Sequence, residues 1–209
     1  RFKYAHDNMD QLAVTVTQSN TVPTFTESKF NSSFALRVDC DTAETAQDAD
    51  DRAQIVYVVE GFDYAQIKGK TVTLSFWVRS TKTGIHCVGF RNNGADRSYV
   101  AEYTVNASNV YEKKVITLPL NPTGGTDNFT NGSGLTISWA LVVGSNFQTT
   151  ANAWQTGNFI ATANQVNSMD NSANDFILAQ VQLYVGDSDK PFVRAGKSFA
   201  EELALCQRY

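Results

Sequence analysis

The sequence has little charge, few cysteines and histidines and little proline, and these shortages exclude several kinds of protein. Charged residues make up 18% of the 209 residues, and the net charge is -4. A nucleic-acid binder needs a basic patch, and the sequence shows none. No apolar run approaches the roughly 18–20 residues of a membrane-spanning helix. We therefore expect neither nucleic acid as a partner nor insertion into a membrane.

The cysteines and histidines lie too far apart in the sequence to form a recognisable metal-binding motif. The three cysteines, Cys40, Cys87 and Cys206, form no C-x-x-C pair. Their odd number and wide spacing favour reduced thiols over a disulfide framework. The two histidines, His6 and His86, are too isolated to predict a histidine-rich metal site.

Short alternating segments dominate the sequence and predict β-strands. In the clearest one, residues 71–79, four apolar side chains fall on one face: Val72, Leu74, Phe76 and Val78. The other face is polar apart from Trp77, and the segment ends in Arg79. Such a strand buries one face and presents the other to solvent or to a ligand.

Nine strands are predicted, and they are separated by turn-rich segments. They cover residues 12–17, 33–39, 53–59, 71–79, 85–91, 99–105, 113–118, 135–143 and 176–185. Helices do not alternate with these strands, so we predict one all-β domain over residues 1–209, an antiparallel β-sandwich of the jelly-roll type. A helical turn is expected near 62–68. A capping box at 198–201, followed by Leu203 and Cys206, predicts a short C-terminal helix.

Several runs of the sequence resemble a family of phage virion proteins: tail fibres, tailspikes and related appendages. The likeness extends from about residue 33 to the end. The runs are Thr71-Val-Thr-Leu-Ser-Phe-Trp-Val-Arg-Ser80, Asp96-Arg-Ser-Tyr-Val-Ala-Glu-Tyr103, Gln148-Thr-Thr-Ala-Asn-Ala-Trp-Gln-Thr-Gly-Asn158 within 135–167, Leu178-Ala-Gln-Val-Gln-Leu183 and Phe199-Ala-Glu-Glu-Leu-Ala-Leu-Cys-Gln-Arg-Tyr209.

This resemblance implies a jelly roll similar to carbohydrate-binding modules, displayed on a virion and directed at host-surface polysaccharide or lipopolysaccharide. It also implies other virion proteins as partners, and many such appendages are homotrimers. Where relatives often carry Gln in the strand before Glu60, this chain has Tyr57, so its ligand preference is expected to differ. The abrupt start at Arg1 is consistent with a fragment of a longer virion protein.

Sugar recognition requires aromatic faces that stack on pyranose rings and planar polar groups that satisfy hydroxyls. The candidate ligand-binding residues are Trp77, Arg79, Tyr57, Arg91, Asn92, Tyr99 and Tyr103. A structural role is the alternative for each, because many aromatic residues of a two-layer sandwich only fill its core. We expect a subset of these residues to form the site.

The acidic segment 39–51 raises the question of a metal ion. Carboxylate oxygens suit Ca²⁺, and the candidate ligands are Asp39, Asp41 and Glu44. The segment lacks EF-hand spacing, and an acidic solvated loop is the more ordinary interpretation. Calcium is therefore the one cofactor that the sequence brings into question.

Three functions remain open. The first is non-catalytic glycan binding on a virion appendage, and the second is a passive structural or decoration module of the virion. The third is a tailspike-type glycan hydrolase, which needs two facing carboxylates that the sequence does not identify. No established catalytic motif occurs in the chain, so we expect a binding protein rather than an enzyme.

Overall fold

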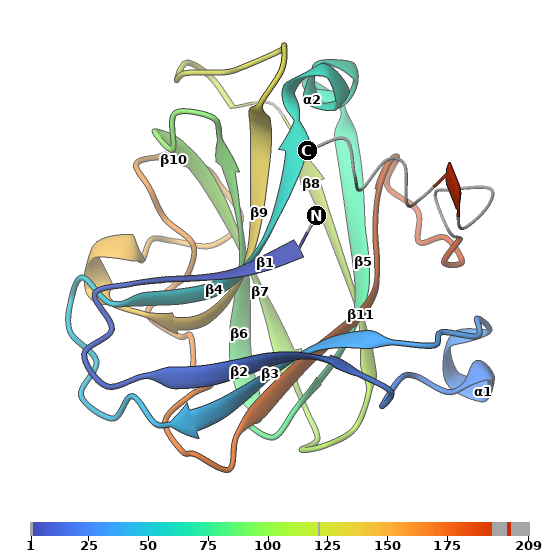
Figure 1. Ribbon diagram of the computed structural model, residues 1–209. Helices are drawn as coiled ribbons and strands as arrows, with labels where there is room; N and C mark the ends of the chain where they lie inside the picture. Colours follow the sequence, from blue (N-terminus) through green and yellow to red (C-terminus); the bar gives the residue numbers. More distant parts are fainter. Residues whose placement is uncertain (1, 121, 194–199, 202–209) are drawn as a thin grey trace.

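Two antiparallel β-sheets packed face to face make up the protein (Figure 1). The computed structural model describes residues 2–120, 122–193, 200 and 201. All strand pairs within the two sheets are antiparallel, and the inner faces of the sheets enclose one large hydrophobic core. This arrangement confirms the predicted β-sandwich of the jelly-roll type.

One sheet has six strands and the other has five. The six-stranded sheet has the order β1 (Phe2–Asp7), β4 (Arg52–Glu60), β9 (Ser133–Val143), β6 (Gly84–Asn92), β7 (Arg97–Val105) and β10 (Trp154–Thr156). The five-stranded sheet has the order β2 (Ala13–Ser19), β3 (Ala35–Thr42), β11 (Asp175–Val185), β5 (Thr71–Ser80) and β8 (Glu112–Pro119). Edge strands β1 and β2 belong to different sheets, and the cleft described below lies beside them.

Nine strands lie where the sequence predicts them, whereas β1 and β10 were not predicted. The predicted helical turn is α2 (Gly61–Ile67), and two further short helices are α1 (Phe25–Ser28) and the 3-10 helix η1 (Ser145–Phe147). The predicted C-terminal helix and Cys206 lie outside the described residues, apart from Ala200 and Glu201. No helix among the described residues is both long and apolar enough to cross a membrane.

The core is built from the alternation that the sequence shows. The predicted inner side chains of β5, Val72, Leu74, Phe76 and Val78, are all fully buried. On the facing sheet the Trp139 ring lies edge-on to Phe76, with 5.7 Å between ring centroids. Cys40 and Cys87 are buried free thiols.

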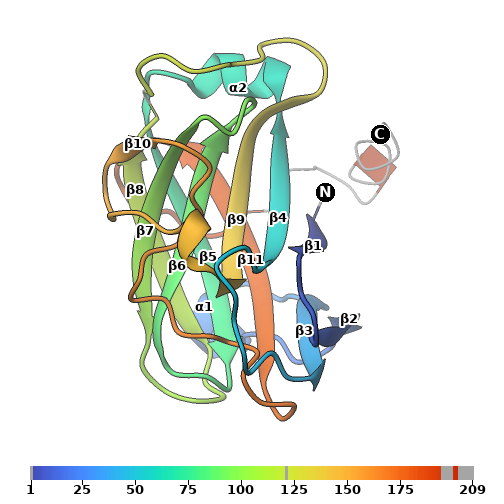
Figure 2. The same ribbon diagram turned by 90° about the vertical axis from the view of Figure 1, so that its left-hand side faces the viewer.

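The long polar segment between β9 and β11 covers the outer face of the six-stranded sheet (Figure 2). A second hydrophobic cluster joins Ile160 of this segment to Cys87, Val100 and Ala140 of the sheet. Gly89 permits the close approach, because a Cβ there would lie 2.7 Å from the Cα of Ile160. Strands β6, β7 and β9 are therefore buried on both faces.

Candidate functional site

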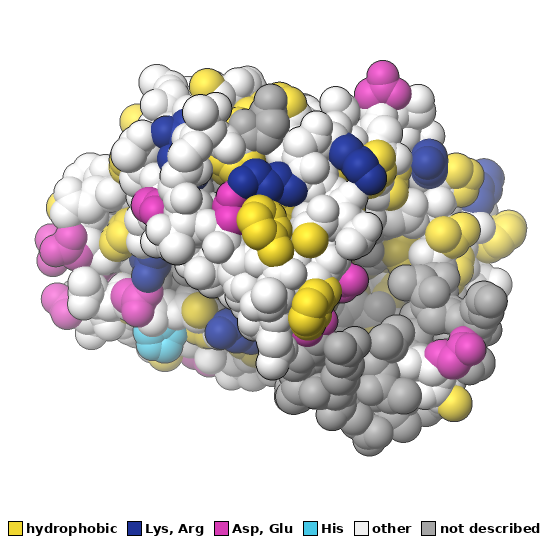
Figure 3. Space-filling view, turned by 90° about the horizontal axis from the view of Figure 1, so that it is seen from above, with side chains coloured by type: hydrophobic (Ala, Val, Ile, Leu, Met, Phe, Trp, Pro, Cys, Tyr) yellow, Lys and Arg dark blue, Asp and Glu magenta, His cyan; other side chains and the backbone are white. Residues whose placement is uncertain are grey.

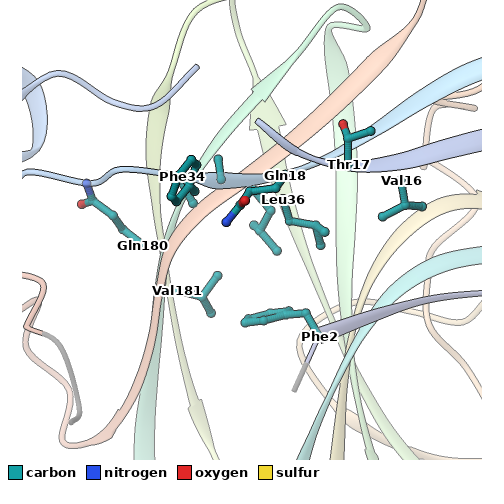
Figure 4. Close-up of a pocket in the computed structure, with 11 residues that line it drawn as sticks. Phe2, Val16, Thr17, Gln18, Phe34, Leu36, Gln180 and Val181 are labelled. Atoms are coloured by element: carbon teal, nitrogen blue, oxygen red, sulfur yellow. The ribbon is translucent and has the colours of Figure 1, made fainter. Parts of the chain in front are cut away.

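A cleft opens between the two sheets beside their edge strands β1 and β2, and we call it the edge cleft. It consists of two hollows of 620 and 530 Å³, which share Phe2, Phe34, Gln180 and Val181 as lining residues. Side chains of both sheets reach it, and Figure 4 shows the Phe2 ring extending toward Val181 of β11. The edge cleft is large enough to hold a saccharide unit.

Aromatic rings form the walls of the edge cleft. The rings are those of Phe2, Phe30, Phe34, Tyr57 and Phe192. Phe2 and Tyr57 contact each other at 4.9 Å between centroids, and Phe30 meets Phe192 edge-on at 4.8 Å. Phe34 is 57% exposed, so its ring is available to a ligand. Exposed aromatic faces in a hollow are the groups that stack on the C–H face of a sugar.

Three glutamine amides are among the polar side chains of the edge cleft: Gln18, Gln180 and Gln182. Each amide carries two N–H donors and a carbonyl acceptor, which match the donor and acceptor character of sugar hydroxyls. Gln182 Oε1 accepts a hydrogen bond from the Val193 N–H at 2.9 Å, and this bond holds the chain beside the cleft.

Gln180 positions one wall of the edge cleft. Strand β11 has an irregularity between Ala179 and Gln182, and Gln180 takes a left-handed conformation there, with φ of 47°. Its Nε2 donates to Ser28 Oγ and Ser32 Oγ, both at 2.9 Å. These two bonds fix the segment that carries Phe30 and Phe34. The Oε1 of Gln180 is buried, and no described group hydrogen-bonds to it.

The edge cleft is almost uncharged. Among the described residues that line it, Asp63 is the one ionisable acid, and neither lysine nor arginine contributes. Asp63 is exposed in the first turn of α2. Ligand binding there depends on apolar contact and neutral hydrogen bonds.

The structure divides the predicted ligand-binding residues among five places, and of these residues only Tyr57 lines the edge cleft. Trp77 and Arg79 share the outer face of the five-stranded sheet, as their spacing predicts, and neither lines the edge cleft. Trp77 is half-buried against Ala179 and Ile177. The Arg79 guanidinium donates to the Asn109 carbonyl at 3.1 Å and to Asp175 at 3.3 Å.

Tyr99 and Tyr103 were predicted to face a ligand, and the structure places both rings inside the core. Tyr99 is 6% exposed and packs against Trp154, with ring centroids 5.7 Å apart. Tyr103 is 7% exposed and lies between Phe76 and His86. Burial raises the pKa of both phenols. The alternation along β7 places both tyrosines on one face with Ala101 and Val105, and this face packs into the core.

Arg91 lies on the outer face of the six-stranded sheet, largely covered by the segment between β9 and β11. It is 8% exposed and donates to Asn158 Oδ1 at 2.7 Å, Ser138 Oγ at 3.1 Å and Gln54 Oε1 at 3.3 Å. Burial lowers the pKa of Arg91 to about 10. These bonds join sheet and covering segment, so in this structure Arg91 acts in packing rather than at an open site.

Asn92, which was predicted as a ligand contact, organises a turn and is itself buried. Its amide donates to Asp96 Oδ1 at 2.7 Å and to the Thr126 carbonyl at 3.1 Å. Its carbonyl oxygen accepts from the N–H groups of Asp96 and Arg97. These four bonds satisfy the Asn92 side chain without a ligand.

The three predicted calcium ligands do not come together. Asp39 pairs with Arg37, Asp41 accepts from the Thr15 hydroxyl at 2.7 Å, and Glu44 accepts from the Gln11 and Ala46 N–H groups. In the described part of the chain, no three His, Cys, Asp or Glu side chains are grouped to hold a metal ion. Calcium binding stays an untested prediction.

Comparison with known proteins finds likeness in solved structures alone. No protein family matches the sequence, and no curated protein matches it either. The fold is similar to the CBM22-2 xylan-binding domain of Paenibacillus barcinonensis Xyn10C, at 16% identity over 88% of this chain and 91% of that one, with a TM-score of 0.45. It is also similar to the family 11 carbohydrate-binding module of Clostridium thermocellum, at 11% identity over 90% of this chain and 91% of that one, with a TM-score of 0.42.

A third similar structure is the enzymatically active domain of tailspike protein 4 from bacteriophage CBA120. The identity is 11% and the TM-score 0.44, and the match covers 88% of this chain but 19% of the tailspike chain. This chain thus corresponds to about a fifth of the length of that protein. Likeness at these identities and TM-scores does not carry function from one protein to another, so the function is argued from the edge cleft.

Most residues of the edge cleft were not predicted from the sequence: Phe2, Phe30, Phe34, Gln180, Gln182 and Phe192. One signal of Gln180 is nevertheless present, because the apolar residues Leu178, Val181 and Leu183 break the two-residue period of a strand. Such a break is typical of a β-bulge, and bulges are frequent beside functional sites. The aromatic residues have no comparable signal, since the cleft forms only when the two sheets are assembled.

Proposed function

We propose that this chain is a non-catalytic glycan-binding domain of a phage virion appendage, such as a tail fibre. Its ligand is a host-surface polysaccharide or lipopolysaccharide, held in the edge cleft. The observation that carries the proposal is the presence of exposed aromatic rings and glutamine amides in one hollow between the sheets. The virion setting is supported by the resemblance of several sequence runs to virion appendage proteins.

The chemistry of the edge cleft supports binding without bond cleavage. Phenyl and phenol rings bury the apolar faces of sugars, and amides exchange hydrogen bonds with hydroxyls. Hydrolysis of a glycosidic bond needs a second carboxylate that faces the first. Asp63 would need such a partner, and the described lining offers amides and hydroxyls instead.

The decisive experiment measures glycan binding by the chain and by two phenylalanine variants. Phe34 lines the edge cleft and Phe25 does not, and both side chains are 57% exposed. We expect Phe34→Ala to weaken binding at least about tenfold, because the loss of one stacking ring removes more than about 1.4 kcal/mol. The matched control Phe25→Ala should bind as the unchanged chain does.

Three other results would contradict the proposal. Equal binding by the two variants would place the ligand elsewhere. Absence of any glycan binding, together with loss of particle assembly in Phe34→Ala, would indicate a structural module. New reducing ends after incubation with host polysaccharide would indicate a hydrolase.

A further inference from the structure

We infer that the edge cleft selects neutral saccharides whose rings carry an apolar substituent, the methyl group of a 6-deoxy sugar or of an N-acetyl group. Sugars that carry a carboxylate, such as uronates, are disfavoured. This inference rests on the proposed function, because it concerns the ligand of the same site. It follows from the distribution of charge and of apolar surface within the cleft.

The charge of the described lining disfavours an anionic ligand. Asp63 is the one ionisable acid among the described lining residues, and none of them is a lysine or an arginine. Asp63 is exposed and takes part in none of the ion pairs of the described chain. A carboxylate entering the cleft would lose water, find no cation and meet a like charge.

The apolar part of the lining favours a methyl substituent. One hollow is walled by Phe2, Val16, Phe34, Leu36 and Val181, and its polar groups are neutral (Figure 4). A sugar with hydroxyls on every carbon would leave these side chains in contact with polar groups. A methyl group there would replace water on apolar surface and strengthen binding about fourfold.

The edge cleft differs in its charge from other surfaces of the chain. On the outer face of the five-stranded sheet, Arg37 and Arg79 both reach Asp175. Cations therefore lie on strands that also form the cleft, yet the described lining consists of rings, aliphatic side chains, amides, hydroxyls and the single carboxylate of Asp63. Charge selectivity belongs to the cleft and not to the whole chain.

The test is a glycan array in which each backbone is printed in four forms: fully hydroxylated, N-acetylated, 6-deoxy and C6-oxidised uronate. One such set is a β-1,4-linked glucose tetramer with its N-acetylglucosamine, 6-deoxyglucose and glucuronate equivalents. We expect the bound backbones to prefer the N-acetyl or 6-deoxy form by about fourfold over the hydroxylated form. The uronate forms should bind more than about tenfold more weakly than the hydroxylated forms.

Two charge variants make the result specific to the edge cleft. Asp63→Lys places a cation at the opening and should reduce the discrimination against uronates to less than about threefold. Asp187→Lys makes the same change at an exposed residue that does not line the cleft, so it should leave the discrimination intact.

The outcomes separate this inference from the proposed function. Uronate forms that bind as tightly as neutral ones, with binding still lost in Phe34→Ala, would overturn the inference and leave glycan binding in place. Equal binding of hydroxylated and methyl-bearing forms would overturn the part that concerns the apolar hollow. If no printed form binds, the proposed function itself fails.

Discussion

At the residue scale, Gln180 connects an irregular backbone to the shape of the edge cleft. Replacing it with methionine keeps the length of the side chain but removes the donors to Ser28 and Ser32. We expect Gln180→Met to lower the free energy of unfolding by about 1–2 kcal/mol, and to weaken glycan binding because Phe30 and Phe34 lose their anchor. Urea unfolding and calorimetric titration measure the two effects. Gln66→Met, at an exposed position of α2, is the control.

The left-handed conformation at Gln180 allows the effect of its amide on glycan binding to be separated from its effect on stability. Gln180→Gly removes the amide but relieves the positive φ of 47°, which glycine adopts at no steric cost. We expect this variant to be more stable than Gln180→Met while binding glycan just as weakly. Normal binding by Gln180→Gly would contradict a role of the amide in positioning the wall.

A second residue, His86, makes the stability of the fold depend on pH. His86 is fully buried beside Tyr103 and Ser168, and burial lowers its pKa to about 4. In the unfolded chain the pKa of this histidine is about 6.5, so the unfolded state binds more protons than the folded state between pH 4 and that value. Stability is therefore complete above the unfolded pKa and falls as the pH drops toward 4. We expect a loss of about 2 kcal/mol between pH 7 and pH 5.

Denaturant titrations at pH 7 and pH 5 test this expectation. His86→Gln should abolish most of the difference, whereas His6→Gln changes an exposed ring and should preserve it. The same pH difference in the chain and in His86→Gln would show that other groups cause the acid sensitivity.

At the scale of elements, the sequence predicts strands better than the surroundings of their side chains. The alternation in β5 identifies both its buried face and the face that Trp77 and Arg79 share. In β7 the alternation groups Tyr99 and Tyr103 on one face, but two tyrosines on an apolar face can fill a core or meet a ligand, and the sequence of the strand does not distinguish the two roles. The edge cleft could not be predicted from any single strand, since Tyr57, Phe34 and Gln180 lie on three strands or their approaches and meet only after assembly.

The covering segment provides a prediction at this same scale. Gly89 has no positive φ, so alanine suits its backbone, but the new Cβ would lie 2.7 Å from the Ile160 Cα. We expect Gly89→Ala to push the segment from the sheet and to lower the free energy of unfolding by about 1–3 kcal/mol. Glycan binding at the edge cleft, on the other side of the sheet, should persist. Unchanged stability in urea unfolding would show that the segment is packed more loosely than the structure indicates.

At the scale of the whole molecule, the chain carries a net charge of -4, yet its proposed binding site is nearly neutral. Seen from above, the Lys and Arg side chains are scattered over the face rather than gathered in one basic patch (Figure 3). Binding through the edge cleft should therefore release few counterions, and salt should screen little of its energy.

We expect the glycan dissociation constant to change less than about twofold between 50 and 500 mM NaCl, since apolar contacts and neutral hydrogen bonds are not screened. Calorimetric titration of the chain with one glycan at the two salt concentrations measures the dissociation constant directly. The same titrations of Phe34→Ala are the control, because they show how much binding does not depend on the edge cleft. Adsorption of an anionic polysaccharide to the scattered cations would instead weaken steeply with salt and be indifferent to Phe34, so the two modes of binding give opposite results in one experiment.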